Sequence, residues 1–360
     1  MYPGSKNPIA SPFIWLKTLS LTNLIILTFL FSSCSDDNPV TPVKPSTALD
    51  TSNLYDWKLD TIYGYNCDFV YTADSNNVFI SAYPAPLYYN GQTYTELNMQ
   101  DPLFICDYPA GYDKDNVFFG GGKSGTYLGD PILKKWTNGN VVSYTITGDS
   151  GVAIRDIFVT GKEECWVSTQ ERYKIYHFNS GEITPYSLDS GQRGSVFCVN
   201  NSGALLAISV KFQNDSYSIL RVYTFDNGSF STVSLDSVNT MFMSPGCTRS
   251  GNDILYTGEK EIIYFNGTTW IKLCDAPVSS PFSNIGGVSR NNFISYGKPD
   301  SGPWQIFVWN GNKWTIEGGA NIYHYYALGA NVNVKDKNIN IIYNVGAGIS
   351  IHMKGILKAK

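Results

Sequence analysis

A short hairpin phrase recurs along the chain and constrains its fold more than any other feature. Each copy has an aromatic residue near the end of a β-rich stretch, a turn built on Asn and Gly, and a second β-rich stretch. The copies are centred on Asn90-Gly91, Asn138-Gly139, Ser180-Gly181, Asn227-Gly228, Asn266-Gly267 and Asn310-Gly311. The turn glycines lie 48, 42, 47, 39 and 44 residues apart. This period is typical of a four-stranded unit repeated around a ring, and not of helical or horseshoe repeats.

The turn residues predict tight antiparallel hairpins. Asn and Gly tolerate the positive φ that a two-residue type I′ turn requires at both central positions. Counting outward from an Asn-Gly loop predicts three cross-strand pairs: Ile263 with Trp270, Phe307 with Trp314, and Leu87 with Tyr94. Pairs of aromatic and aliphatic residues stabilise a sheet by roughly 0.2–1 kcal/mol each.

A second phrase precedes each hairpin and reads as an inner strand, a polar turn and another apolar strand. Its copies are Cys67–Ser81, Leu103–Gly120, Ile157–Ser168, Val196–Ser209, Gly246–Thr257 and Gly286–Ser295, with a worn seventh at Leu328–Tyr343. Together with the hairpin this makes four strands per unit. The predicted fold is an all-β, seven-bladed β-propeller, with six or eight blades as alternatives.

The ends of the chain are predicted to close the ring. Ile349–Met353 supplies a third strand to the last unit, and Gly355 lies 44 residues after Gly311, in register for a turn. After this turn only Ile356 and Leu357 remain as strand-forming residues, which is too few to form an outer strand. Trp57–Ile62 has the character of an outer strand, so we expect it to complete the last blade and to cover two strand edges that would otherwise invite aggregation.

The N-terminus carries a targeting pattern. Lys6 and Lys17 precede an apolar run, Leu19–Phe31, which is too short to cross a bilayer but suits a signal peptide. Ser32-Ser33-Cys34 then resembles a bacterial lipobox. That resemblance implies removal of residues 1–33 and lipidation of Cys34, and an ordinary signal peptide is the alternative.

Residues 34–53 are rich in Pro, Thr and Ser and are predicted to be a flexible tether, leaving 54–360 as the propeller domain. The tether opens with Ser35-Asp36-Asp37-Asn38, which resembles the surface-export tag of lipoproteins in Bacteroidetes-type bacteria. The chain as a whole resembles the β-propeller surface lipoproteins of such bacteria. This resemblance implies an outer-membrane lipoprotein exposed at the cell surface, and it implies no reaction.

The net charge argues against one class of binding partner, and the cysteines allow a prediction of disulfide content. The formal net charge is -4, without a basic stripe, which argues against nucleic acid. Six cysteines remain after Cys34, and we expect buried free thiols, with disulfides as the alternative. No ligand spacing for a metal and no cofactor motif is present, so we predict neither.

No catalytic set stands out, because the chain has only three histidines and its Asp-Gly turns lack the closing aromatic of the sialidase Asp-box. Loops on one face of the propeller are the remaining candidate for recognition. The predicted rim residues are Tyr83, Tyr112, Lys123, Tyr127, Asp130, Asp300, Trp304, His324 and Tyr325. They favour a non-catalytic binding or scaffolding module for protein or glycan. The alternatives are a carbohydrate-active hydrolase or lyase that uses Asp130 or Asp300 in a central funnel, and a purely structural envelope component.

Overall fold

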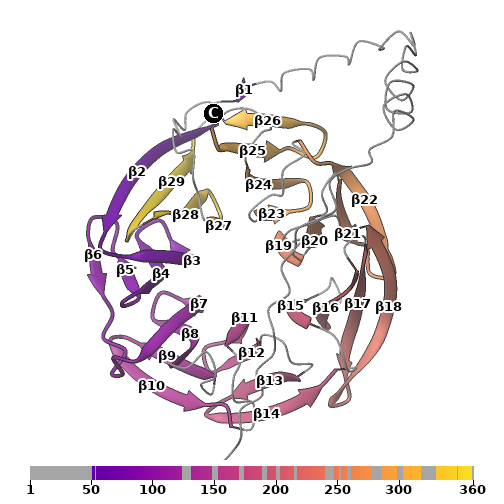
Figure 1. Cartoon of the computed structure of the whole chain (residues 1–360), viewed down its shortest axis with the longest axis horizontal. Coiled ribbons are helices and arrows are strands. Elements are labelled where there is room, and N and C mark those ends of the chain that lie inside the picture. The colour runs from indigo at the N-terminus through magenta and orange to yellow at the C-terminus, as the bar shows by residue number, and fades with distance from the viewer. Residues whose placement is uncertain are drawn as a thin grey trace, which may run out of the picture. The chain divides into compact units, whose positions relative to one another are not determined.

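The computed structural model describes residues 51–52, 54–123, 131–147, 153–169, 174–188, 193–199, 203–214, 217–239, 247–250, 253–257, 261–277, 285–297, 303–317, 330–346 and 348–358. They belong to one compact unit, Leu49–Lys360. Its described residues are all-β, and a search among them for apolar helices of membrane-spanning length finds none. The strands form seven four-stranded blades around a ring (Figure 1), so the prediction of a seven-bladed propeller is confirmed.

Blades I to VI run outward from the ring axis in chain order, and blade VII takes its outer strand from the N-terminal end of the domain. Blade I is β3 (Asn66–Asp74), β4 (Asn77–Tyr83), β5 (Leu87–Tyr89) and β6 (Tyr94–Glu96). Blade II is β7 (Phe104–Asp113), β8 (Asn116–Lys123), β9 (Ile132–Thr137) and β10 (Asn140–Thr145). Blade III is β11 (Ile154–Gly161), β12 (Glu164–Thr169), β13 (Lys174–Asn179) and β14 (Glu182–Ser187). Blade IV is β15 (Arg193–Val199), β16 (Leu205–Asn214), β17 (Tyr217–Asp226) and β18 (Ser229–Asn239).

The remaining blades follow the same plan. Blade V is β19 (Cys247–Ser250), β20 (Asp253–Thr257), β21 (Glu261–Phe265) and β22 (Trp270–Asp275). Blade VI is β23 (Ile285–Ser289), β24 (Asn292–Gly297), β25 (Gln305–Trp309) and β26 (Trp314–Glu317). Blade VII is β27 (Ala330–Lys335), β28 (Asn338–Gly346), β29 (Ile349–Leu357) and β2 (Tyr55–Tyr63). One parallel pair, Ser250 with Gly287, joins the inner strands of blades V and VI.

The closure of the ring by the N-terminal segment is confirmed. Strand β2 pairs antiparallel with β29 along its whole length, from Tyr55 opposite Leu357 to Tyr63 opposite Ile349. Just before it, β1 (Thr51–Ser52) pairs parallel with β26 of blade VI, and the Leu54 N–H donates to Glu317 Oε2 at 3.1 Å. The segment therefore fastens two neighbouring blades. Strand β1 falls inside the stretch that the sequence predicts as tether.

The expected turn at Gly355 is wrong. Gly355 lies inside β29, directly opposite Trp57 on β2. A Cβ atom on Gly355 would come within 2.8 Å of the Trp57 ring, so the indole occupies the space of the missing side chain. The strand continues to Leu357 because this glycine makes room for a cross-strand tryptophan and does not reverse the chain.

The hairpins fall into two classes, where the sequence predicted one. Turns at Asn138-Gly139, Ser180-Gly181 and Asn227-Gly228 are two-residue loops with positive φ at both positions, as expected. Turns that begin at Asn90, Asn266 and Asn310 contain four residues. The three cross-strand pairs predicted from a two-residue loop are therefore wrong, and the observed pairs are Phe265 with Trp270, Trp309 with Trp314 and Tyr89 with Tyr94.

In the four-residue loops the asparagine acts through its side chain. Asn266 Oδ1 accepts hydrogen bonds from the N–H groups of Thr268 and Thr269, both at 2.9 Å. Asn90 and Asn310 accept the corresponding pair of bonds in their own loops. Such bonds replace backbone contacts that a tighter turn would make, which is the usual role of Asn at the first position of a turn.

The two classes predict opposite responses to glycine. Asn138 adopts φ of 49° and is exposed, so Asn138→Gly should leave the free energy of unfolding unchanged within about 0.5 kcal/mol. Asn266→Gly removes the accepting oxygen and should lower the free energy of unfolding by about 1 kcal/mol. Urea denaturation of the two variants measures the difference. Equal effects would contradict the two-class assignment.

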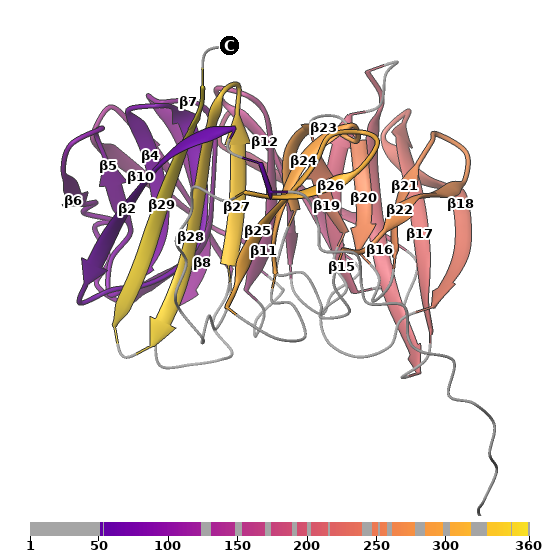
Figure 2. The same ribbon diagram turned by 90° about the horizontal axis from the view of Figure 1, so that it is seen from above.

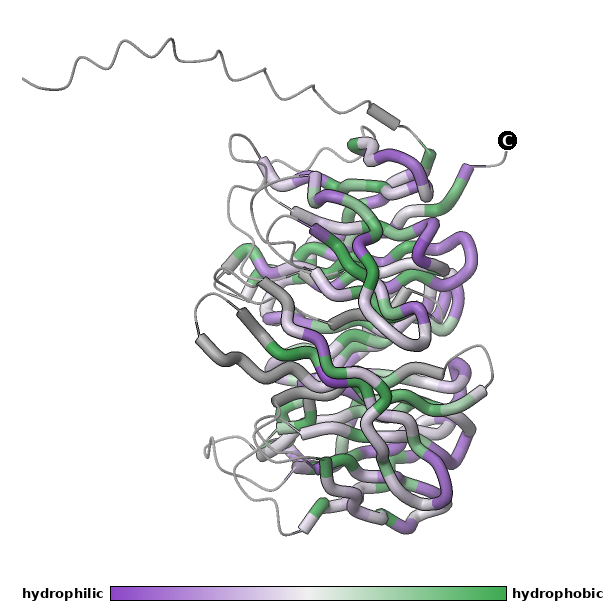
Figure 3. The backbone as a smooth tube through the Cα atoms, turned by 90° about the vertical axis from the view of Figure 1, so that its right-hand side faces the viewer, coloured by the Kyte–Doolittle hydropathy of each residue, from purple (hydrophilic) through white to green (hydrophobic). Residues whose placement is uncertain are grey.

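The core lies between the blades. Each cluster of buried apolar residues joins neighbouring sheets, as Phe118, Ile157 and Phe178 do for blades II and III. In Figure 3 the strands carry green stretches, whereas the turns on the side of the C label are largely purple. The four cysteines whose side chains the structure describes, Cys67, Cys106, Cys165 and Cys274, are buried free thiols as predicted. Cys198 and Cys247 have side chains outside the described set.

Candidate functional site

The two ends of the ring differ in what they present. We call the end that carries the hairpin turns and the β3–β4 type of turn the turn face, and the opposite end, where the second strand leads to the third, the loop face. The turn face is uppermost in Figure 2, next to the C label. Every inner strand begins at the loop face.

Repeated bulges shape the inner edge of the loop face. On β3 the register shifts between Cys67 and Val70, so Asp68 and Phe69 together oppose Ser81 of β4. The Phe69 N–H donates to Ser81 Oγ at 2.9 Å, which fixes the bulge. A bulge re-aims side chains and breaks the alternation of a strand. It turns both Asp68 and Phe69 away from the position that a regular strand would give them.

The same bulge occurs one blade further on. On β7 the register shifts between Cys106 and Tyr108, leaving Asp107 as the extra residue. Across from it Gly121 has no room for a side chain, because a Cβ there would lie 1.8 Å from the Ile105 carbonyl oxygen. This glycine therefore lets β7 approach β8 closely enough to form the bulge.

The bulge on β3 places Phe69 against blade II and Asp68 against blade VII. The rings of Phe69 and Tyr108 lie 4.4 Å apart between centroids. Toward blade VII, the Asn344 amide donates to Asp68 Oδ1 at 3.0 Å. Burial raises the pKa of the Asp68 carboxyl, and the bond from Asn344 opposes that rise. A carboxylate at this end of the ring suits a cationic side chain.

Two exposed tyrosines lie on the same face where blades VII and I meet. Tyr63 is 72% exposed and Tyr83 is 53% exposed. Tyr83 pairs with Asn66, whose side chain accepts a hydrogen bond from the Gly348 N–H at 3.2 Å. Gly348 directly precedes Ile349, the partner of Tyr63. The tyrosines thus flank one junction, and neither is needed to fill the core.

The predicted rim residues are only partly brought together. Tyr83 lies on the loop face, and so does the backbone of Lys123, which pairs with Phe104 at the end of β8. Trp304 also precedes a strand there, but it is half-buried and stacks on Tyr296 with centroids 5.0 Å apart. It packs against the core cluster of blades VI and VII, so it has a structural role.

One rim assignment is wrong. Tyr112 lies beside the β7–β8 turn, next to the Asp113–Asn116 pair, and therefore belongs to the turn face. It is 53% exposed, but at the opposite end of the ring from Tyr83. The other predicted residues lie outside the described residues: Cys34, Tyr127, Asp130, Asp300, His324 and Tyr325.

Sequence reasoning missed Tyr63, Phe69 and Tyr108. A signal for the last two was present, because Cys-Asp-aromatic occurs at Cys67–Phe69 and again at Cys106–Tyr108. Both triplets open an inner strand. Tyr63 had no signal, since nothing in an outer strand of alternating residues distinguishes its exposed end.

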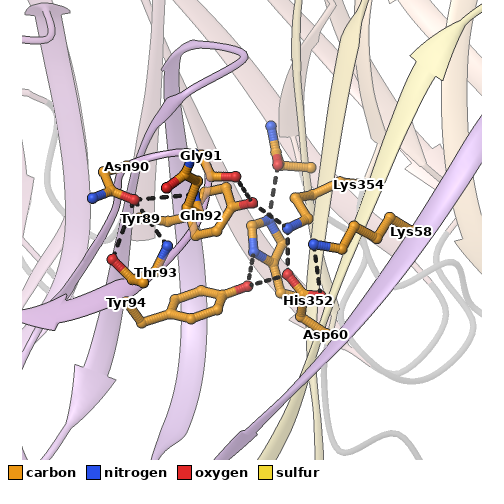
Figure 4. Close-up of polar contacts among 11 residues, drawn as sticks. Lys58, Asp60, Tyr89, Asn90, Gly91, Gln92, Thr93, Tyr94, His352 and Lys354 are labelled. Atoms are coloured by element: carbon orange, nitrogen blue, oxygen red, sulfur yellow. Dashed lines mark hydrogen bonds and ion pairs between the residues drawn. The ribbon is translucent and has the colours of Figure 1, made fainter.

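A second polar cluster lies where the ring closes, between blade VII and blade I (Figure 4). His352 is fully buried on β29, with Nδ1 2.9 Å from the Tyr94 hydroxyl and Nε2 2.8 Å from Asn340 Oδ1. The Tyr94 hydroxyl donates to Asp60 Oδ2 at 3.0 Å. Lys354 forms an ion pair with Asp60 and donates to the Tyr89 hydroxyl at 2.6 Å.

The environment keeps this histidine neutral. Burial lowers the pKa of His352 to about 3, and nearby Lys354 adds to the effect while Asp60 opposes it. Hydrogen bonds from Lys354 and Tyr94 lower the pKa of Asp60 against the effect of burial. The cluster therefore joins a neutral imidazole to a charged pair across the closing blades. Its burial suits it to stabilising the closure and not to contacting a ligand.

Metal chemistry has no donor set in the described part of the chain, where no group of three or more His, Cys, Asp or Glu could hold an ion. Comparisons of this chain with known proteins support the assignment of the fold. No protein-family model and no curated protein matches the chain.

Solved structures do match. A structure of YCF48 bound to D1 peptide aligns with a TM-score of 0.58 at 13% identity, covering 87% of this chain and 100% of that one. The extracellular domain of BT4673 from B. thetaiotaomicron aligns with a TM-score of 0.53 at 10% identity, covering 82% of this chain and 40% of that one. BamB from Moraxella catarrhalis aligns with a TM-score of 0.50 at 11% identity, covering 83% and 99%. At such identities the likeness shows the fold alone, and the chain is a seven-bladed β-propeller.

Proposed function

We propose that this protein is a lipid-anchored β-propeller of the outer membrane, exposed at the cell surface, that binds an extended protein segment on its loop face without catalysis. The lipobox-like Ser32-Ser33-Cys34 and the acidic residues after it support the anchoring. With Cys34 lipidated and residues 34–50 as tether, the propeller stays at the membrane while its loop face remains free to bind.

One observation carries the binding role. Tyr63 and Tyr83 flank the junction of blades VII and I on the loop face, and both are more than half exposed. The half-buried Phe69 and Tyr108 rings pack against each other between blades I and II at the same end of the ring. Tyrosine supplies large contact area at little entropic cost, which is why it is enriched at binding surfaces. The exposed carboxylate of Asp68 on the same face favours a segment that carries Lys or Arg.

A protein segment fits better than a sugar for two reasons. The structurally similar YCF48 is bound to a peptide, which shows that this fold accommodates one. The Phe69 and Tyr108 rings are also tilted by 36° to each other and do not form one flat platform. The hydrolase alternative depends on Asp130 and Asp300, which lie outside the described residues, and no described contact favours it.

Binding is tested with a displayed library of unstructured peptides selected on the intact protein. We expect the selected peptides to be enriched in Lys and Arg. The double variant Tyr63→Ala, Tyr83→Ala should bind them at least about tenfold more weakly, which corresponds to about 1.4 kcal/mol.

Tyr112→Ala is the matched control, because Tyr112 is as exposed as Tyr83 but lies on the turn face. Its affinity for the selected peptides should equal that of the wild type. Loss of binding in the control, or retention of full affinity in the double variant, would place the binding surface elsewhere. A glycan array that yields ligands while the peptide library yields none would replace the protein segment with a sugar.

A further inference from the structure

The turn face has an apolar corner where blades VI and VII meet. We give this name to four exposed residues: Leu54, Val288, Ile356 and Leu357, which are 41%, 43%, 54% and 37% exposed. Leu357 faces blade VI, and its neighbour Ile356 leaves the other side of β29 at the same end of the ring. Val288 and Leu357 line one pocket together with Tyr55, Val334 and Lys337, so the two blades present a continuous surface there. Leu54 is joined to it by the hydrogen bond from the Lys358 N–H to the Leu54 carbonyl, at 2.9 Å.

The corner contrasts with its surroundings. The hairpin turns on this face are built on polar residues and Gly, and Figure 3 shows turns on this side in purple, whereas the end of β29 near the C label is green. Exposed apolar side chains that gather at one place on a polar surface mark a contact with another molecule or with a membrane. The remaining question is which of these covers the corner.

Charged residues around the corner favour a lipid headgroup layer. Lys335 and Lys337 are exposed in the β27–β28 turn, with Asp336 between them. Lys358 adds a third cation, placed 3.5 Å from Asp56. Apolar tips surrounded by lysines are the pattern of a surface that lies in a membrane interface, where lysine stems follow the acyl boundary and ammonium groups meet phosphates.

The N-terminal segment connects the apolar corner to the proposed lipid anchor. Leu54 belongs to the segment that enters the domain, only two residues after β1. Cys34 lies 17 residues before Thr51, and such a stretch spans at most roughly 60 Å when extended. A lipid on Cys34 would therefore keep the corner within reach of the bilayer at all times. Even weak contacts then form efficiently, since tethering raises the effective concentration of the second site.

We propose that the apolar corner rests on the membrane to which Cys34 is anchored, so that the turn face lies against the bilayer and the loop face points outward. This inference rests on the proposed lipid anchor. It adds an orientation: the tether fixes distance only, and the corner selects which end of the ring meets the lipid. The loop face with Tyr63 and Tyr83 is then the end presented to partners.

The test uses the full, lipidated protein in vesicles of phosphatidylethanolamine and phosphatidylglycerol. Photo-reactive benzoylphenylalanine replaces Ile356 in one variant and Leu235 in another, and mass spectrometry counts the lipid adducts. Leu235 is the matched control because it is 55% exposed on β18 of blade IV, away from the corner. We expect at least about tenfold more lipid adduct at position 356. The change Lys335→Gln with Lys337→Gln should reduce that yield severalfold.

Each outcome separates this inference from the anchor itself. A Cys34→Ser variant that leaves the vesicles, together with no lipid adduct at position 356 of the wild-type chain, would overturn the orientation while the anchor stands. A Cys34→Ser variant that stays bound like the wild type would instead overturn the anchor. Adducts of position 356 with a second copy of the chain, or equal lipid adducts at positions 356 and 235, would also overturn the orientation.

Discussion

Gly121→Ala is expected to destabilise the propeller by about 4 kcal/mol or more, or to prevent folding altogether. A Cβ at this position would lie 1.8 Å from the Ile105 carbonyl oxygen and 3.0 Å from the Phe104 ring. The first contact is with backbone, so no side-chain rotation relieves it. Strand β7 would have to move away from β8 and lose the bulge at Asp107.

Gly122→Ala is the matched control. Gly122 is the next residue in the same strand, and an added Cβ there meets nothing within 4 Å. Its free energy of unfolding should change by less than about 1 kcal/mol. Urea denaturation with linear extrapolation measures both variants. If the two alanines have the same effect, the close approach of β7 and β8 does not depend on Gly121.

The largest dependence on solution conditions is expected below pH 6.5. The pKa of His352 is lowered to about 3 in the folded protein, whereas an unfolded histidine titrates near 6.5. Between these values the unfolded chain binds a proton that the folded one does not, so stability is complete above pH 6.5 and falls as the pH falls. The slope is about 1.4 kcal/mol per pH unit, and the loss from pH 6.5 to 5 is about 2 kcal/mol.

A His352→Gln variant should have a lower stability at pH 7 but a flatter dependence on pH between 6.5 and 4. Leu59→Ser on β2 is its control, because Leu59 is 42% exposed and carries no titratable group; its pH slope should match the wild type. Asp60 does not affect the slope in this range. Its pKa is lowered in the folded protein, so the stability that it contributes is lost only as the pH falls below the ordinary pKa of a carboxyl group. Denaturant unfolding at a series of pH values gives the slopes. A His352→Gln slope as steep as the wild type would assign the acid sensitivity to other groups.

Six blades could be read from the sequence because a turn glycine marks each one independently of any packing, and the seventh could be read from the polar-turn phrase at Leu328–Tyr343. The lengths of the hairpin loops could not. Asn-Gly serves both as a type I′ turn at Asn138 and as the start of a four-residue loop at Asn266, and the backbone dihedral that separates them is not encoded in the dipeptide. The cross-strand pairs differ accordingly, since Phe265 and Trp270, which pair across the longer loop, stand one before and four after the asparagine.

The candidate site was less accessible to sequence reasoning. Tyr112 was assigned to the wrong face because its place in the repeat was used without considering which end of β7 it occupies. Trp304 looks like an exposed platform in a loop, yet it covers Tyr296. Phe69 and Tyr108 were not singled out because the bulges at which they lie cannot be read from the residue pattern. The predicted roles of Tyr127, Asp130, Asp300, His324 and Tyr325 remain predictions, because these residues lie outside the described residues.

The pairing of β2 with β29 has a consequence for biogenesis. Tyr55 is among the first residues of the domain to be synthesised, and its partner Leu357 is among the last. Every other blade can assemble from contiguous chain, but this one must wait for the full length, and such distant contacts form slowly. A chain cut short before β29 would keep two unpaired edges open to chaperones and proteases. The last blade can therefore form only in a chain that has been synthesised through β29.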